Sequence, residues 1–80
     1  MNDIAYGMVQ ETYYFGTVAR ISYGIAVYSW PESEGTVSII ASAHDVSSNK
    51  DQVEHLVCLC NRDHLEPKHL NNIVEDFLSS

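Results

Sequence analysis

Apolar and polar residues alternate with a period of two through residues 18–30, which indicates a β-strand with one buried and one solvated face. The apolar side holds Ile21, Tyr23, Ile25 and Val27, and the other side holds Arg20, Ser22, Gly24 and Ala26. A run of β-formers precedes it over Val9–Phe15 and stops at Gly16, which predicts a first strand. Residues 1–8 are either a loose lead-in or part of that strand.

The segment 31–35 contains a proline, which interrupts a strand, then two acidic residues and a glycine, a composition typical of a hairpin loop. Thr36–Ala43 then returns as a third strand, with Val37, Ile39 and Ala41 on one side. Connections this short allow only antiparallel neighbours, because a parallel pair needs a crossover of about a dozen residues. The first half of the chain therefore predicts an antiparallel meander.

The period changes to 3.6 after Ala43, which indicates helices. Ser48 with Asp51 three residues later is typical of a capping box at a helix start. One apolar stripe follows and ends near residue 61 or 62; it consists of Val53, Leu56, Val57 and Cys60. We therefore predict a helix over residues 48–62.

A second helix is predicted directly afterwards. Pro67 suits its first turn, and Leu65 and Leu70 are spaced as a hydrophobic staple. Its apolar face comprises Leu70, Ile73, Val74, Phe77 and Leu78. We therefore predict one α+β domain of order β-β-β-α-α, a three-stranded antiparallel meander (residues 9–44) with a helical hairpin (48–79) packed on one sheet face.

The formal net charge is -7, with four Lys and Arg residues scattered among eleven acids. Backbone contacts to nucleic acid need clustered positive charge, and so does binding to anionic membranes, so we expect neither partner. Asp3 lies where a signal peptide carries positive charge, and no apolar run approaches the ~18 residues of a membrane span. A cytoplasmic location is the simplest expectation.

Two cysteines, Cys58 and Cys60, raise the possibility of a metal- or thiol-dependent module that also uses His55 and His64. Residues two apart on a helix point about 200° from each other, so both thiols cannot hold one metal from that helix. The spacing also matches no usual zinc pattern. We expect the cysteines to act as small packing residues, with no metal and no cofactor.

His44 and Asp45 lie at the expected junction of strand and helix, where a carboxylate could orient an imidazole for general-base chemistry or help bind a small ligand. The sequence holds no Gly-rich phosphate loop, nucleophile elbow or zincin motif. Two helices over the only sheet face leave little room for a pocket of ~300 Å³. We predict no enzyme and no catalytic residue. The acids Glu75 and Asp76 belong to a solvated helix face.

The sheet face away from the helices is the strongest candidate for a contact surface. It is predicted to present Tyr28, Trp30 and Ala26, with Ile40, Ser38 and Ser42 from the next strand and Tyr14 from the first. Aromatic residues are enriched in interface cores, and an open strand edge can pair with another chain. We predict a non-enzymatic interaction or regulatory module that self-associates as a homodimer. The expected contact residues are Tyr14, Tyr28, Trp30 and Ile40. The alternative is that Tyr28 and Trp30 shield a loop at the strand end.

Several short motifs of the chain are shared with a family of small uncharacterised bacterial proteins, which come mostly from clostridia. They are Tyr23-Gly24-Ile25, Leu56-Val57 with Cys60-Asn61, Leu65-Glu66-Pro67-Lys68-His69-Leu70, and Val74-Glu75-Asp76-Phe77-Leu78. The chain resembles this family over roughly residues 20 to 79, except that Glu66 replaces the usual small polar residue before the proline. The resemblance implies a domain of unknown function, with no catalytic residue or cofactor to transfer.

Overall fold

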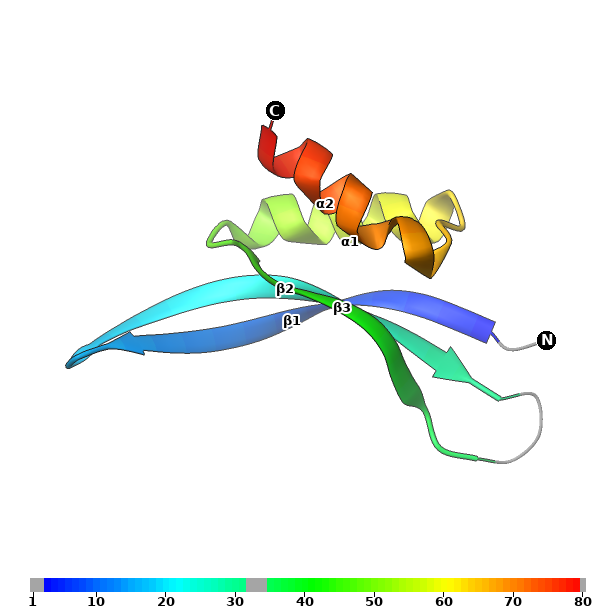
Figure 1. Cartoon of the computed structure of the whole chain (residues 1–80), viewed down its shortest axis with the longest axis horizontal. Helices are drawn as coiled ribbons and strands as arrows, with labels where there is room; N and C mark the ends of the chain where they lie inside the picture. Colours follow the sequence, from blue (N-terminus) through cyan, green and yellow to red (C-terminus); the bar gives the residue numbers. More distant parts are fainter. Residues whose placement is uncertain (1–2, 32–34, 80) are drawn as a thin grey trace.

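The computed structural model describes residues 3–31 and 35–79 and contains one open three-stranded sheet. Its strands are β1 (Asp3–Phe15), β2 (Val18–Trp30) and β3 (Ser38–Ser47), antiparallel in the order β1-β2-β3. The helices α1 (Lys50–Arg62), η1 (Pro67–His69) and α2 (Leu70–Ser79) lie together over one face of the sheet (Figure 1). The predicted α+β architecture is confirmed. Residues 32–34 of the predicted hairpin loop lie outside the described residues.

β1 is longer than the pattern predicted. It begins at Asp3 and pairs with β2 without interruption from Asp3–Trp30 to Phe15–Val18. Residues 3–8 are therefore part of the strand and not a loose lead-in. The reason is Tyr6, which is buried in the core and whose hydroxyl donates to the carbonyl of Leu65 at 2.6 Å. Gly16 makes the tight turn into β2 with a φ of 65°.

β3 starts two residues later than predicted and continues to Ser47, four residues past Ala43. Its pairing is irregular: Tyr23 lies opposite Ser47 while Ile25 lies opposite Ala43. Three residues of β3, including Asp45 with a φ of 52°, therefore bulge out opposite Gly24 alone. We call residues 44–46 the bulge. The change of period at this point marks an interrupted strand and not yet a helix.

The first helix confirms its predicted apolar stripe, since all four of its residues are buried. Its N-cap differs: Asn49, not Ser48, accepts a hydrogen bond from the backbone N–H of Gln52, at 3.2 Å from Oδ1. Asn is as good an N-cap as Ser, so composition alone did not separate the two adjacent candidates. Asp51 lies in the first turn, as expected.

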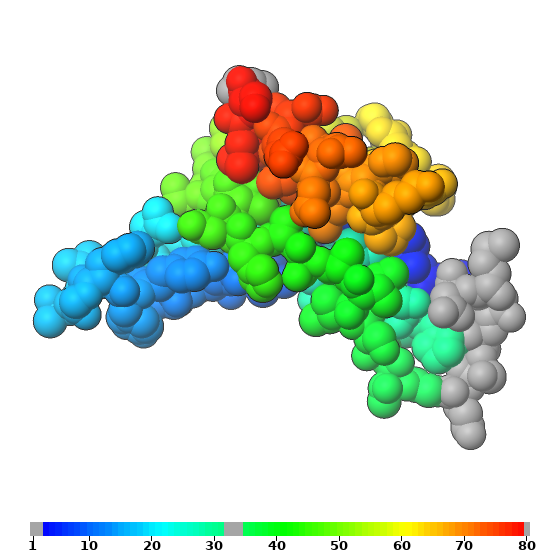
Figure 2. Space-filling view, viewed as in Figure 1, coloured from blue at the N-terminus to red at the C-terminus, as the bar shows by residue number. Residues whose placement is uncertain are grey.

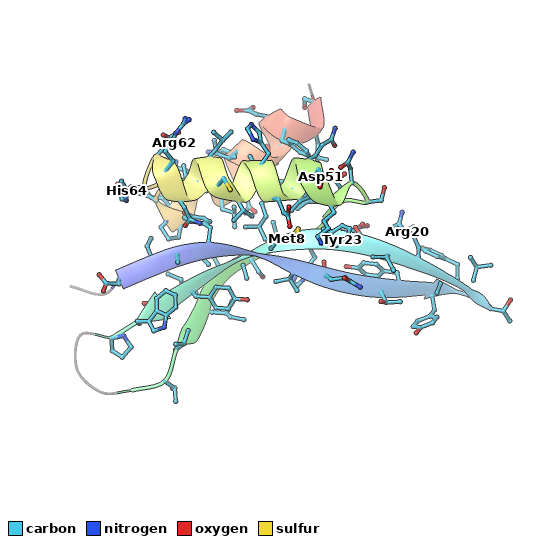
Figure 3. The ribbon with its side chains drawn as sticks, turned by 180° about the vertical axis from the view of Figure 1, so that it is seen from behind. Met8, Arg20, Tyr23, Asp51, Arg62 and His64 are labelled. Carbon is cyan, nitrogen blue, oxygen red and sulfur yellow. The ribbon has the colours of Figure 1, made fainter. Side chains whose placement is uncertain are left out.

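The second helix is preceded by a short 3-10 turn that Pro67 opens, and Glu66 makes no side-chain capping bond there. Leu70 and Val74 are buried and Ile73 and Phe77 pack against the core, but Leu78 is exposed. The core between sheet and helices consists of Tyr6, Ile25, Val27, Val46, Val53, Leu56, Val57, Cys60, Leu70 and Val74. Figure 3 shows Met8 and Tyr23 between the sheet and α1, and both pack against this core.

The far end of the β1–β2 hairpin projects well beyond the helices, as the blue and cyan strands of Figure 1 show. The space-filling view shows the same segment as a narrow extension (Figure 2). We call residues 11–22 the arm. Ile21 lies on it and is exposed, contrary to its predicted place under the helices, because the helices do not reach this far.

Candidate functional site

The face of the sheet opposite the helices is the first candidate, and we call it the reverse face. Ile25 and Val27 are buried on the helix side, so Ala26, Tyr28 and Trp30 point the other way. Trp30 is 41% exposed and Tyr28 is half-buried. In the described residues, the three helical segments contact the sheet from the other side (Figure 1).

One of the four predicted contact residues, Tyr14, does not lie where the pattern put it, and the pairing of β3 adds Ile39 to this face. Tyr14 pairs with Ala19 and alternates onto the helix side of the sheet, so it does not share the reverse face with Trp30. Ile40 is the extra residue of a second irregularity of β3, and Ile39 lies opposite Tyr28 instead. Both isoleucines are exposed. Because the register shifts by one residue at this point, the strict period of two did not identify Ile39 as the residue opposite Tyr28.

Other small residues also differ from the prediction. Ser38 pairs with Ser29, a residue of the helix side, so it does not face outward with Trp30. Ala26 and Ser22 do point to the reverse face but are buried and not solvated. The reverse face is therefore hollowed near its centre, with a volume of about 130 Å³. This hollow is lined by Val9, Glu11, Gly24, Ile25, Ala26, Ile39, Ser42, Ala43 and His44.

A chain of polar contacts borders the hollow. Glu11 binds His44 through its Oε2, 2.7 Å from Nδ1, and its Oε1 accepts the backbone N–H of Asp45 at 3.0 Å. Both contacts lower the pKa of Glu11 below its ordinary value, and the hydrogen bond from the backbone N–H of Asp45 has the larger effect. The other ring nitrogen, Nε2, lies 3.3 Å from the hydroxyl of Ser42. In the neutral ring, Nδ1–H would donate to Glu11 and Nε2 would accept from Ser42.

Asp45 does not orient His44, contrary to the sequence-based expectation. Its carboxylate accepts a hydrogen bond from the hydroxyl of Ser22 at 2.5 Å and forms an ion pair with Arg20 at 2.9 Å. The bond from Ser22, with Arg20 as a further cause, lowers the pKa of Asp45. Arg20 also lies over the rings of Tyr13 and Phe15. Glu11 was missed because it is 33 residues from His44, so no local spacing connects the two.

The polar cluster is built to hold the bulge. Glu11 binds two consecutive bulge residues, and Ser22 binds Asp45 and the carbonyl of Ser47. An oriented imidazole is one requirement of general-base catalysis. However, the side chain of His44 is 70% exposed, and the hollow is well below the ~300 Å³ of a typical ligand pocket. The polar cluster therefore stabilises the bulge, and its geometry does not form a ligand pocket around His44.

The cysteines and the other histidines do not converge. Cys58 is exposed and Cys60 is buried, and burial, with Asp63 as a second cause, raises the pKa of the Cys60 thiol. Cys60 shares a small hollow with His64, at the opposite end of α1 from Asp51 in Figure 3. Within residues 3–31 and 35–79, no three side chains from His, Cys, Asp and Glu are grouped to hold a metal.

Comparison with known families decides the relationship of the chain. A model of a family of unknown function, DUF6514, matches residues 2–80. The chain belongs to this family. The match covers more than the 20–79 suggested by the shared motifs, and it includes all of β1. No curated protein and no solved structure matches the chain.

Membership in DUF6514 establishes a domain of unknown function and transfers no site residue. Among the described residues, no helix has the length and apolar character needed to cross a membrane. The surfaces that remain to be explained are the reverse face, the arm and the strand edges.

Proposed function

We propose that this DUF6514 domain is a non-enzymatic interaction module of a bacterial cytoplasm that self-associates through its sheet. The reverse face is the contact surface, and the partner is a second copy of the chain. One observation carries the proposal: Trp30, Tyr28 and Ile39 lie on a face that the described helices leave uncovered. Exposed aromatic and branched side chains of this kind form the cores of protein interfaces.

The distribution of charge favours a second copy as the partner. The chain carries a net charge of -7, yet residues 4–10, 21–31 and 35–43 contain no Asp, Glu, Lys or Arg. These ranges form the centre of the sheet and its Trp30 end. Two copies that meet there bring few like charges into contact, because the nearest carboxylates, Asp3 opposite Trp30 and Glu11 at the hollow, lie at the two ends of this region. Contact between the acidic helical surfaces would bring more. Most oligomers of identical chains close with a two-fold axis, so a homodimer is the expected assembly.

A double substitution tests the reverse face. Trp30→Ala with Tyr28→Ala removes its two aromatic side chains and should lower the mass of the assembly in sedimentation equilibrium, because the copies lose this contact. Leu78→Ala is the matched control, because Leu78 is an exposed apolar residue of α2, on the helical side. An unchanged mass in the double variant would rule out the reverse face as the contact surface.

A further inference from the structure

The outer edge of β1 is closed at one residue by a side chain. Asn61 of α1 accepts the backbone N–H of Tyr6 at 2.8 Å and donates from Nδ2 to the carbonyl of the same residue at 3.0 Å. The amide of Asn61 thus occupies the position of a neighbouring strand. These bonds also show that the backbone groups of Tyr6 point away from β2 and toward the edge.

The same direction holds for every second residue of the strand. Backbone groups alternate between the two sides of a strand, so Met8, Gln10, Thr12 and Tyr14 also present their N–H and C=O groups to the outer edge. In the described part of the chain, no hydrogen bond from another segment closes this stretch as Asn61 closes Tyr6. The edge of β1 is therefore open along the arm.

Most of the usual protections of an edge strand are missing from Val9–Phe15, whose one charged residue is Glu11. Bulges, prolines and lysines prevent edges from pairing with other chains. β3, the other edge, has two irregularities, whereas β1 pairs with β2 without a break. Val9–Phe15 contains no proline and no lysine, and five of its seven residues are β-branched or aromatic. We call Val9–Phe15 the edge segment.

We propose that the edge segment pairs antiparallel with the edge segment of a second copy, about a two-fold axis at Thr12. This joins the two sheets into one continuous six-stranded sheet. The proposal concerns a strand edge and does not depend on the reverse face, although both surfaces bind the same kind of partner. A two-stranded ribbon is only marginally stable in water, so such pairing would also support the arm.

Charge and length select the register. An axis at Glu11 would place two carboxylates directly opposite each other, which destabilises a sheet. An axis at Gln10 would require Tyr6 opposite Tyr14, and the edge at Tyr6 is already occupied by Asn61. An axis at Thr12 uses all of the edge segment and meets neither obstacle.

The central pair and the end pairs formed in this register are of favourable kinds. Thr12 lies opposite its own copy, Gln10 opposite Tyr14, Glu11 opposite Tyr13, and Val9 opposite Phe15. Threonine pairs and pairs of an aromatic with a β-branched residue are among those that stabilise neighbouring strands. Thr12, Gln10 and Tyr14 are the residues whose backbone groups face the edge, so the three pairs would form about six hydrogen bonds.

Disulfide cross-linking tests the register. In a Cys58→Ser background, Thr12→Cys should form a cross-linked dimer under mild oxidation, because the Cα atoms of a hydrogen-bonded pair lie about 5.5 Å apart. Gln10→Cys is the matched control: it shares the face and edge of Thr12, but its two copies would lie more than ~13 Å apart. It should not cross-link by itself, and neither should Tyr14→Cys. A mixture of these two variants should cross-link.

The outcomes separate this proposal from the reverse face. Specific cross-linking of Thr12→Cys that persists in the chain with Trp30→Ala and Tyr28→Ala supports edge pairing. Equal cross-linking of Thr12→Cys and Gln10→Cys indicates random collision and overturns it. Loss of the Thr12→Cys cross-link in the double variant assigns the contact to the reverse face and also overturns it.

Discussion

Gly24 shows most directly how one residue shapes this surface. A Cβ atom added there would lie 2.5 Å from the carbonyl oxygen of Ala43 and 2.9 Å from Oε1 of Glu11. The missing side chain lets the bulge pass over β2 and lets Glu11 reach His44. The bulge, and with it the polar cluster, therefore depends on this glycine.

Gly24→Ala should lower the free energy of unfolding by about 1–3 kcal/mol, because the backbone of β3 must move to admit the methyl group. Urea denaturation measures the change. Gly7→Ala is the matched control, since its nearest contact is the side chain of Tyr28, which can rotate away. Equal losses in the two variants would contradict the role given to the bulge.

At the residue scale the sequence was least informative about contacts between distant segments. Nothing local connects Glu11 with His44, or Tyr6 with Asn61, which are 33 and 55 residues apart. His44 and Asp45 were chosen as a pair because they are adjacent, but adjacent residues of a strand point in different directions. The side chain that reaches His44 comes from another strand.

At the element scale, prediction succeeded where the period was unbroken. The strand of residues 18–30 and the helix ending at 61 or 62 were found with nearly the observed bounds. β3 was misjudged because its two irregularities break the alternation on which the prediction depends. The first half of β1 was left open because its partner groups, Val27 and Asn61, are far away in the chain.

The bulge should make stability sensitive to acid. Folding lowers the pKa of two carboxylates. Hydrogen bonds from the backbone N–H of Asp45 and from His44 lower the pKa of Glu11. A hydrogen bond from Ser22, together with Arg20, lowers the pKa of Asp45. Their contribution is complete above the unfolded pKa values and is lost as the pH falls through the lowered folded ones. The urea midpoint should therefore decrease as the pH falls below about 4.5.

Glu11→Gln isolates the part that Glu11 contributes to this pH dependence. The variant should be less stable at neutral pH and should show a shallower loss in acid, because one of the two carboxylates no longer titrates. Parallel midpoint curves for the wild-type chain and Glu11→Gln would contradict the assignment.

At the scale of the whole molecule, charge and apolar surface are separated. The acids of residues 48–79 lie in the helical layer, whereas residues 4–10, 21–31 and 35–43 of the sheet region carry no charge. The reverse-face contact uses the uncharged ranges, and the edge segment carries one charged residue, Glu11, next to its proposed axis at Thr12. The main electrostatic cost of association is then the general repulsion between two chains of charge -7.

Raising the ionic strength should strengthen self-association, because salt screens this repulsion and leaves apolar and backbone contacts intact. Sedimentation equilibrium at low and high sodium chloride measures the change in the dimer dissociation constant. Weaker association at high salt would show that ion pairs hold the copies together, and both proposed surfaces would then be wrong.

The bond between Asn61 and Tyr6 also has a consequence for biosynthesis. The residue that protects the first strand is made 55 residues after the residue it protects. Until Asn61 has left the ribosome, the outer edge of β1 is open at Tyr6 as well as along the arm and can pair with neighbouring nascent chains. The residue that closes this edge at Tyr6 is translated late, so the greatest risk of misassembly falls before α1 is complete.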